Sequence, residues 1–199
     1  MKMDVRFDGN HVRYTGAVGI LMASGTKEVT LVNNEVEETA GNGIEIGKFV
    51  VDDKTDYHTA YNPDDIREVC TNDRILNNKI HDIGTQYEGS VGIGAGYVQG
   101  IMIANNTVYN CPYTGISMGY GWTSDANPMK YNSIIRNEVY NVNNIVCDGG
   151  AIYTLSNQYP SSRIEENYLH DNYASEGLDY GSCGIYLDEQ SDGFSVKNN

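Results

Sequence analysis

The apolar and polar positions of the chain recur in a fixed order along its whole length. One or two apolar residues are followed by asparagine, a variable residue and an aliphatic residue, as in LVNNEV at 31–36 and IANNTV at 103–108. The repeated asparagines are Asn10, Asn34, Asn78, Asn106, Asn137, Asn167 and Asn199, at spacings of 24 to 44 residues. A period of this size indicates a solenoid, in which each repeat buries its apolar face against its neighbours.

A second apolar motif follows each of the first six asparagines, as in NGIEIG at 42–47 and CGIYLD at 183–188. Its aligned isoleucines are Ile20, Ile44, Ile93, Ile116, Ile152 and Ile185. The pattern predicts two short strands per repeat, with their isoleucines facing inward. Stacked asparagines at the corner would link neighbouring coils through their side-chain amides, and asparagine tolerates the unusual backbone angles of a corner.

The two motifs together resemble the right-handed parallel β-helix of pectate-lyase-like proteins over essentially the whole chain. The expected fold is therefore an all-β solenoid of about six to seven coils with corner loops, forming a single domain over residues 1–199. Because the chain ends at VKNN, where a new coil would begin, we expect it to be part of a longer helix or to have its last coil covered by a partner. The longest corner loop falls at about 48–74, where Asn62 would cap a short helix at 62–69.

The composition supports a strand-and-turn protein and narrows its partners. The chain has 16 Tyr but only 3 Phe and 1 Trp, together with 22 Gly. Its 27 acids exceed its 13 Lys and Arg, which gives a net charge of −14 and argues against nucleic acid as a partner. No apolar run is long enough to predict membrane insertion. Free, mostly buried thiols are expected for Cys70, Cys111, Cys147 and Cys183.

The outward positions after the isoleucines predict a groove. Small residues such as Gly94 and Gly96 occupy them in the middle coils, whereas Tyr153, Tyr186 and Asp188 occupy them in the last two. Tyr153 is predicted to contact Tyr186 on the next coil, either as a simple aromatic ladder or as a platform for a sugar.

Two further aromatic residues, Tyr120 and Trp122, lie just past the groove in GYGW at 119–122. They would stack on a sugar or pack against a loop.

Carboxylates cluster in the same two coils. Asp148 precedes a strand, and Asp188 and Glu189 follow the strand of the next coil. Two carboxylates facing each other across a groove are what glycoside hydrolysis needs, at separations of roughly 5–5.5 Å for retention or 6.5–9.5 Å for inversion. The alternative is that these acids are ordinary turn residues. Along a straight strand Asp148 and Asp188 are too far apart, so the pair requires the Gly149–Gly150 corner to fold Asp148 back over the groove.

His81 and His170 occupy the same repeat position, and each is followed by aspartate. This pattern predicts a hydrogen-bonded corner, with substrate contact as the alternative for His170. No tight spacing of metal ligands accompanies them, so no metal is assigned.

Several segments, among them DGGAIYT at 148–154 and GIYLDEQSDGFSVKNN at 184–199, resemble bacterial β-helix proteins that break down plant polysaccharides. Glycoside hydrolase family 141, with fucosidase and xylanase members, is the nearest. The resemblance implies an extracellular or periplasmic protein with a poly- or oligosaccharide partner. It places an active site at Asp148, Asp188 and Glu189. The proposed substrate contacts are Tyr120, Trp122, Tyr153, Tyr186 and His170.

Two other functions stay open. A polysaccharide lyase or epimerase would need a basic residue beside a uronate, often with Ca²⁺, and only Lys48 lies in the groove columns. The GHG and RIK signatures of polygalacturonases and the WIDH segment of pectate lyases are missing. A non-catalytic surface β-helix would bind glycans without cleaving them, and open helix ends would allow self-association.

Overall fold

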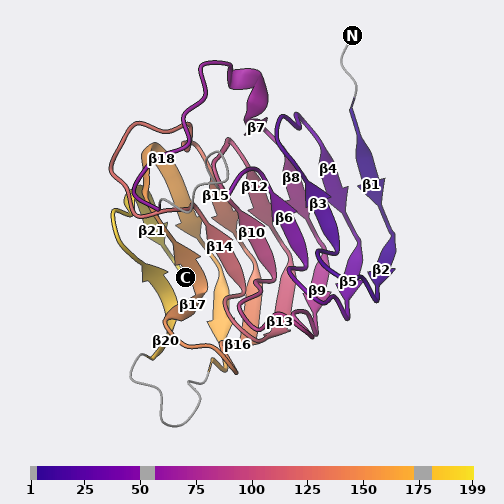
Figure 1. The fold of residues 1–199 in the computed structure, drawn as a ribbon. Helices are drawn as coiled ribbons and strands as arrows, with labels where there is room; N and C mark the ends of the chain where they lie inside the picture. Colours follow the sequence, from indigo (N-terminus) through magenta and orange to yellow (C-terminus); the bar gives the residue numbers. More distant parts are fainter. Residues whose placement is uncertain (1–3, 50–56, 173–180) are drawn as a thin grey trace.

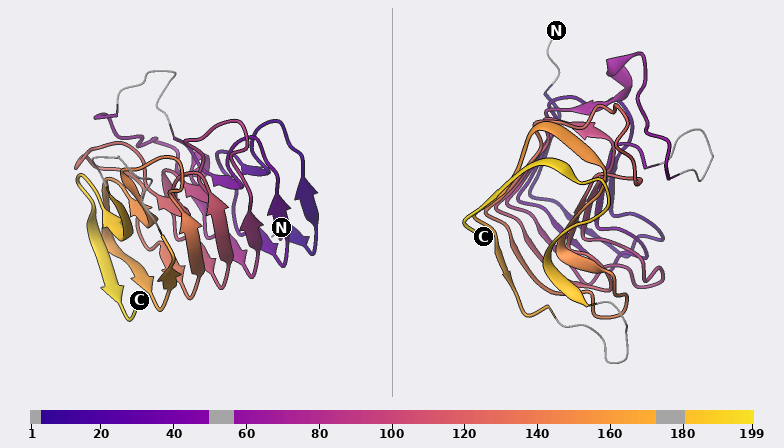
Figure 2. Two further views of the ribbon diagram at one scale, coloured as in Figure 1. Left: turned by 90° about the horizontal axis from the view of Figure 1, so that it is seen from below. Right: turned by 90° about the vertical axis from the view of Figure 1, so that its left-hand side faces the viewer.

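The computed structural model describes residues 4–49, 57–172 and 181–199, and in these the chain winds into a parallel β-helix (Figure 1). Each complete coil contributes one strand to each of three sheets, and strands of successive coils pair in parallel. Viewed nearly along the axis, the coils superimpose on one another (Figure 2, right). The predicted fold is confirmed, but with three strands per coil instead of two, because the chain bends into a separate strand on each side of the repeated asparagine.

Sheet 1 has the order β1 (Arg6–Asp8), β4 (Thr30–Val32), β8 (Arg74–Leu76), β12 (Met102–Ala104), β15 (Ser133–Ile135), β18 (Asn157–Glu165) and β21 (Asp192–Lys197). Sheet 2 consists, in order, of β2 (His11–Arg13), β5 (Glu35–Glu37), β9 (Lys79–His81), β13 (Thr107–Cys111), β16 (Glu138–Val142) and β19 (Tyr168–His170). Sheet 3 consists of β3 (Ile20–Met22), β6 (Ile44–Ile46), β10 (Ile93–Ala95), β14 (Ile116–Met118), β17 (Gly149–Thr154) and β20 (Ser182–Leu187). A small fourth sheet pairs β7 (Cys70–Thr71) with β11 (Val98–Gln99).

The core is a stack of aliphatic columns enclosed by the three large sheets. The predicted inward isoleucines pair in register along sheet 3, and Ile44, Ile93, Ile116 and Ile152 are fully buried. Each such side chain contributes about 1.5–3 kcal/mol through burial. Of the free thiols, Cys70 and Cys111 are buried as expected, whereas Cys147 is half-buried and Cys183 is exposed.

The asparagine ladder runs through the corner between sheets 1 and 2. Asn78 Nδ2 donates to Asn106 Oδ1 at 3.0 Å, and Asn106 Nδ2 donates to Asn137 Oδ1 at 3.0 Å. The same amide groups also bond the backbone of neighbouring coils. The left-handed backbone of this corner falls one residue earlier than predicted, at positions such as Asn105 (φ 56) and Arg136 (φ 53), so the ladder asparagines themselves are free to point inward.

The long corner loop carries the only helix of the described residues, the 3₁₀ helix η1 (Ile66–Glu68). Its N-cap is Asp65, whose carboxylate accepts from the Arg67 backbone N–H at 3.0 Å. The prediction of Asn62 as the cap was therefore wrong, because the helical turn begins three residues later. No helix among the residues described has the length and apolar character to span a membrane.

Replacing a ladder asparagine should destabilise the protein strongly. Asn106→Ala removes an acceptor for the Asn78 backbone N–H and a donor to the Ile75 carbonyl, both in the core. We expect the free energy of unfolding to fall by about 2–4 kcal/mol, measured by urea denaturation. The control Asn62→Ala changes an exposed asparagine and should shift it by less than about 0.5 kcal/mol. Equal effects of the two substitutions would contradict a structural role for the ladder.

Candidate active site on sheet 3

Three tyrosines gather on the outer face of sheet 3 in its last coils. Tyr153 and Tyr186 are register partners on β17 and β20, and their ring centroids lie 5.3 Å apart in an edge-to-face arrangement. This contact confirms the one predicted from the sequence. Tyr113, which lies before β14, places its ring 6.4 Å from that of Tyr153. The three rings form a partly buried aromatic surface next to two carboxylates.

Asp188 is held directly by this surface. The Tyr153 hydroxyl donates to Asp188 Oδ2 at 2.5 Å, a short bond between a phenol and a carboxylate. Burial, together with this bond and the nearby negative charges, raises the pKa of Tyr153 above its usual value. Tyr153 therefore stays protonated and acts as a fixed donor that orients the Asp188 carboxylate.

Asp148 approaches the same surface from the other end of the strand. Its backbone is left-handed (φ 61) just before Gly149, and the Tyr113 hydroxyl donates to its carbonyl oxygen at 2.8 Å. Burial and the interactions of both Asp188 and Asp148 with its hydroxyl raise the pKa of Tyr186 to about 12. Both carboxylates therefore lie near the Tyr186 hydroxyl. The corner thus brings Asp148 back over the sheet.

The groove predicted over the middle coils is filled. Phe49 lies on the outer face of sheet 3, where a Cβ added to Gly94 would come within 3.3 Å of its ring and one added to Gly96 within 3.2 Å. Both glycines are buried. The small residues of these columns make room for an aromatic ring, so the open part of the face is restricted to the coils that carry Tyr153 and Tyr186.

Comparison with known proteins agrees with this architecture. Residues 47–199 match the family model described as "Right handed beta helix region". The chain belongs to this family. A solved structure named "Glycoside hydrolase" superimposes with a TM-score of 0.77 at 25% sequence identity. The match covers 98% of this chain but 37% of that one, so the chain spans well under half the length of its structural relative. No curated protein matches the sequence.

The predicted aromatic contacts Tyr120 and Trp122 pack against the loop inserted into this β-helix. The Trp122 ring lies 4.9 Å from that of Tyr57, and the Trp122 backbone N–H donates to the Tyr57 carbonyl at 2.7 Å. Tyr120 contacts Phe49, Tyr57 and Tyr97 through its ring. Both residues are still half-buried, and they follow β14 at the same edge of sheet 3 at which Asp188 follows β20. They form an aromatic rim beside the site. Of the two alternatives left open by the sequence, stacking on a sugar or packing against a loop, the structure shows packing against a loop.

The remaining predicted site residues are not brought to the tyrosines. The exposed Glu189 accepts a hydrogen bond from the Ser156 backbone through its own carbonyl, at 3.2 Å. His170 lies on sheet 2 of the β-helix, stacked on Tyr140 at 4.8 Å, and its Nδ1 is 2.8 Å from Asp171 Oδ2. The equivalent His81 is bonded to Asp82 in the same way, at 2.7 Å, so the hydrogen-bonded corner predicted for both histidines is present.

Lys48 and the possible metal ligands bear on the lyase alternative. Lys48, the basic residue of the groove columns, places its ammonium 4.8 Å from the centre of the Tyr61 ring. Within residues 4–49, 57–172 and 181–199, no three His, Cys, Asp or Glu side chains are grouped so that they could hold a metal ion.

Sequence reasoning missed Tyr113 and Phe49. Tyr113 precedes its strand and lies outside the aligned columns, while Phe49 comes from the loop that follows β6. The only available signal was the abundance of tyrosine in a chain with few other aromatic residues.

The titration of Tyr186 tests the arrangement of the acids. Its pKa of about 12 exceeds the usual 10.0, so its contribution to stability is complete below about pH 10 and is lost as the pH rises through about 12. Asp188→Asn removes a nearby negative charge and should lower the pH at which Tyr186 ionises, measured by NMR of ¹³Cζ-labelled tyrosine. The control Glu189→Gln alters the adjacent exposed acid and should leave the titration unchanged. A shift in the control alone would contradict the position of Asp188.

Proposed function

We propose that the protein hydrolyses a glycosidic bond of a neutral plant polysaccharide on the outer face of sheet 3, with Asp148 and Asp188 as the paired acids. The observation that carries the proposal is that two tyrosines in ring contact bond the two residues: the Tyr153 hydroxyl donates to the Asp188 carboxylate, and the Tyr113 hydroxyl donates to the Asp148 carbonyl. Both acids therefore border one aromatic surface, as paired acids do in glycosidases. The structural relative, a glycoside hydrolase by name, supports the same reaction class.

The surroundings of the two acids favour different roles for them. The Asp188 carboxylate is oriented by the Tyr153 hydroxyl and lies in a half-buried position, which suits a nucleophile or a base for water. Asp148 takes the complementary role of general acid. It gives its proton to the glycosidic oxygen as the C–O bond breaks. The oxygen of the attacking water ends on the anomeric carbon, the proton that this water loses goes to the carboxylate acting as base, and exchange with solvent then restores both acids.

The charge of the chain and its aromatic groups favour a neutral substrate. A net charge of −14 repels uronate-rich polymers, and no ion pair or cation–π contact within the described residues places a Lys or Arg beside Asp148 or Asp188. The Tyr153 and Tyr186 rings supply apolar faces and hydroxyls of the kind that bind the C–H and O–H groups of a sugar.

Acid-to-amide variants test the assignment. Asp188→Asn and Asp148→Asn should each lower the rate of release of reducing ends from xylan, xyloglucan or a fucosylated glycan by about 10²–10⁴-fold, because a proton-transfer or nucleophilic group is lost. Asp192→Asn, which changes an exposed acid on β21, should retain full activity. Thermal melting verifies that each variant folds.

Other outcomes would contradict the proposal. Full activity of Asp188→Asn with loss in Glu189→Gln would transfer the role to Glu189. A calcium-dependent product that absorbs in the ultraviolet would identify a lyase. Glycan binding without any product from the wild-type chain would identify a non-catalytic β-helix.

A further inference from the structure

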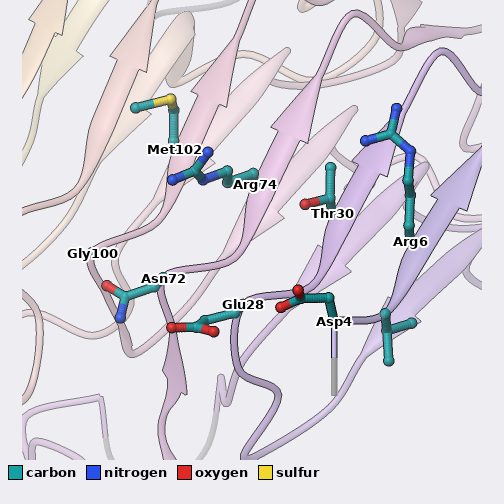
Figure 3. A pocket seen from close by; sticks show the side chains of 9 residues that line it. Asp4, Arg6, Glu28, Thr30, Asn72, Arg74, Gly100 and Met102 are labelled. Atoms are coloured by element: carbon teal, nitrogen blue, oxygen red, sulfur yellow. The ribbon is translucent and has the colours of Figure 1, made fainter. Parts of the chain in front are cut away.

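A second concave surface lies on the outer face of sheet 1 in the first coils (Figure 3). Its volume is about 640 Å³, within the range of roughly 300–1,000 Å³ that is typical of ligand pockets. Its residues come from β1, β4, β8 and β12 and from the corners before these strands. It is therefore built on a different sheet from the tyrosine site.

The pocket is lined by two parallel rows of mostly polar side chains. Arg6, Thr30, Arg74 and Met102 are register partners on four adjacent strands, so they are spaced about 4.8 Å apart along the helix axis. The second row lies two residues earlier and includes Glu28 and Asn72, each with a left-handed backbone at its corner. Figure 3 shows the first row above the second, with the Arg74 guanidinium next to Met102.

Arg74 is exposed, and its guanidinium makes no hydrogen bond or ion pair with any residue in the described parts of the chain. By contrast, Arg6 in the same row is paired with Asp8 at 2.8 Å. A guanidinium offers five N–H donors in a planar fork, which suit the oxygens of a ligand. Arg74 thus has hydrogen-bonding capacity to offer a ligand.

The charges of the pocket restrict the ligand. Two carboxylates, Asp4 and Glu28, line the pocket beside the two arginines, and Arg6 is already paired with Asp8, so the described lining carries no excess of positive charge in a chain of net charge −14. An anion gains little there, and Val5 and Met102 are the apolar side chains of the described lining. Mixed donors and acceptors without an excess of positive charge match sugar hydroxyls, each of which can both donate and accept.

We propose that this pocket is a second carbohydrate site, which binds a neutral oligosaccharide along the axis of the β-helix. The strand spacing of about 4.8 Å is close to the length of one pyranose unit, so successive sugars of an extended chain meet successive strands. Arg74 donates to sugar oxygens, and Glu28 and Asn72 accept from sugar hydroxyls. The site needs no hydrolysis, so it can hold a polymer whether or not sheet 3 cleaves it.

The methyl group of Met102 gives a readout at this site alone. Protein labelled with ¹³C-methyl methionine is titrated with xylohexaose, cellohexaose and an oligogalacturonate of equal length, and the Met102 signal is assigned with Met102→Leu. We expect a neutral hexasaccharide to shift the Met102 signal, and Arg74→Gln to weaken that binding by about tenfold or more, since bonds to a charged donor are lost. Because Arg74 is exposed and unpaired, the variant should keep the melting temperature of the wild type.

The matched control is Arg163→Gln, which changes an arginine of the same outward row on β18, beyond the pocket, and should leave binding unchanged. A Met102 signal that moves with neither neutral hexasaccharide would overturn the proposal. So would tighter binding of the oligogalacturonate, or equal weakening by Arg74→Gln and Arg163→Gln. Asp188→Asn should preserve the Met102 shift. A wild-type chain that shows this shift without hydrolysis would refute the proposed function and leave the second site standing.

Discussion

The structure depends on hydrogen bonds between coils, because the polar groups of each coil find their partners on its neighbours. A single coil has no partner of its own for its strand N–H and C=O groups, nor for the amide of its corner asparagine, and all of these are paired across coils in parallel register. The inward columns are consequently fixed in residue type, with isoleucine at one position and asparagine at another. Chemistry is therefore restricted to the outward columns and the corners.

This constraint explains how much of the fold could be predicted from the sequence. A column that must stack on itself leaves the same residue at the same place in every repeat, so Ile44, Ile93 and Ile116 were identifiable before the structure. The separate strand after the ladder asparagine could not be identified from the sequence. Strands β5 and β9 are only three residues long, and their first residues belong to the same sequence motif as the ladder asparagine. The left-handed residue was also misplaced by one position, since Arg136 and Glu166 give no sign of such a backbone.

The candidate site was predictable only where its residue differed in type from the residues at the same position in the other coils. Asp188 follows coils that carry glycine or other uncharged residues at its position, and that difference marked it. The return of Asp148 toward it depends on a corner whose direction no pattern encodes. A column of small residues is also ambiguous. Small side chains are needed both where the surface forms an open groove and where an aromatic ring from a loop covers the sheet. Gly94 and Gly96 were interpreted as a groove, and the Phe49 ring lies on them.

The electrostatic repulsion between the acids of this site argues that they are not ordinary turn residues. Two carboxylates near one phenol repel each other in a chain that is already strongly acidic. The phenols of this surface are protonated at neutral pH, as an ordinary tyrosine also is, and burial and the nearby acids raise the pKa of Tyr113 and Tyr186 further, to about 12. The Tyr153 hydroxyl is therefore a donor aimed at the Asp188 carboxylate before any ligand arrives, an arrangement that turn formation does not require.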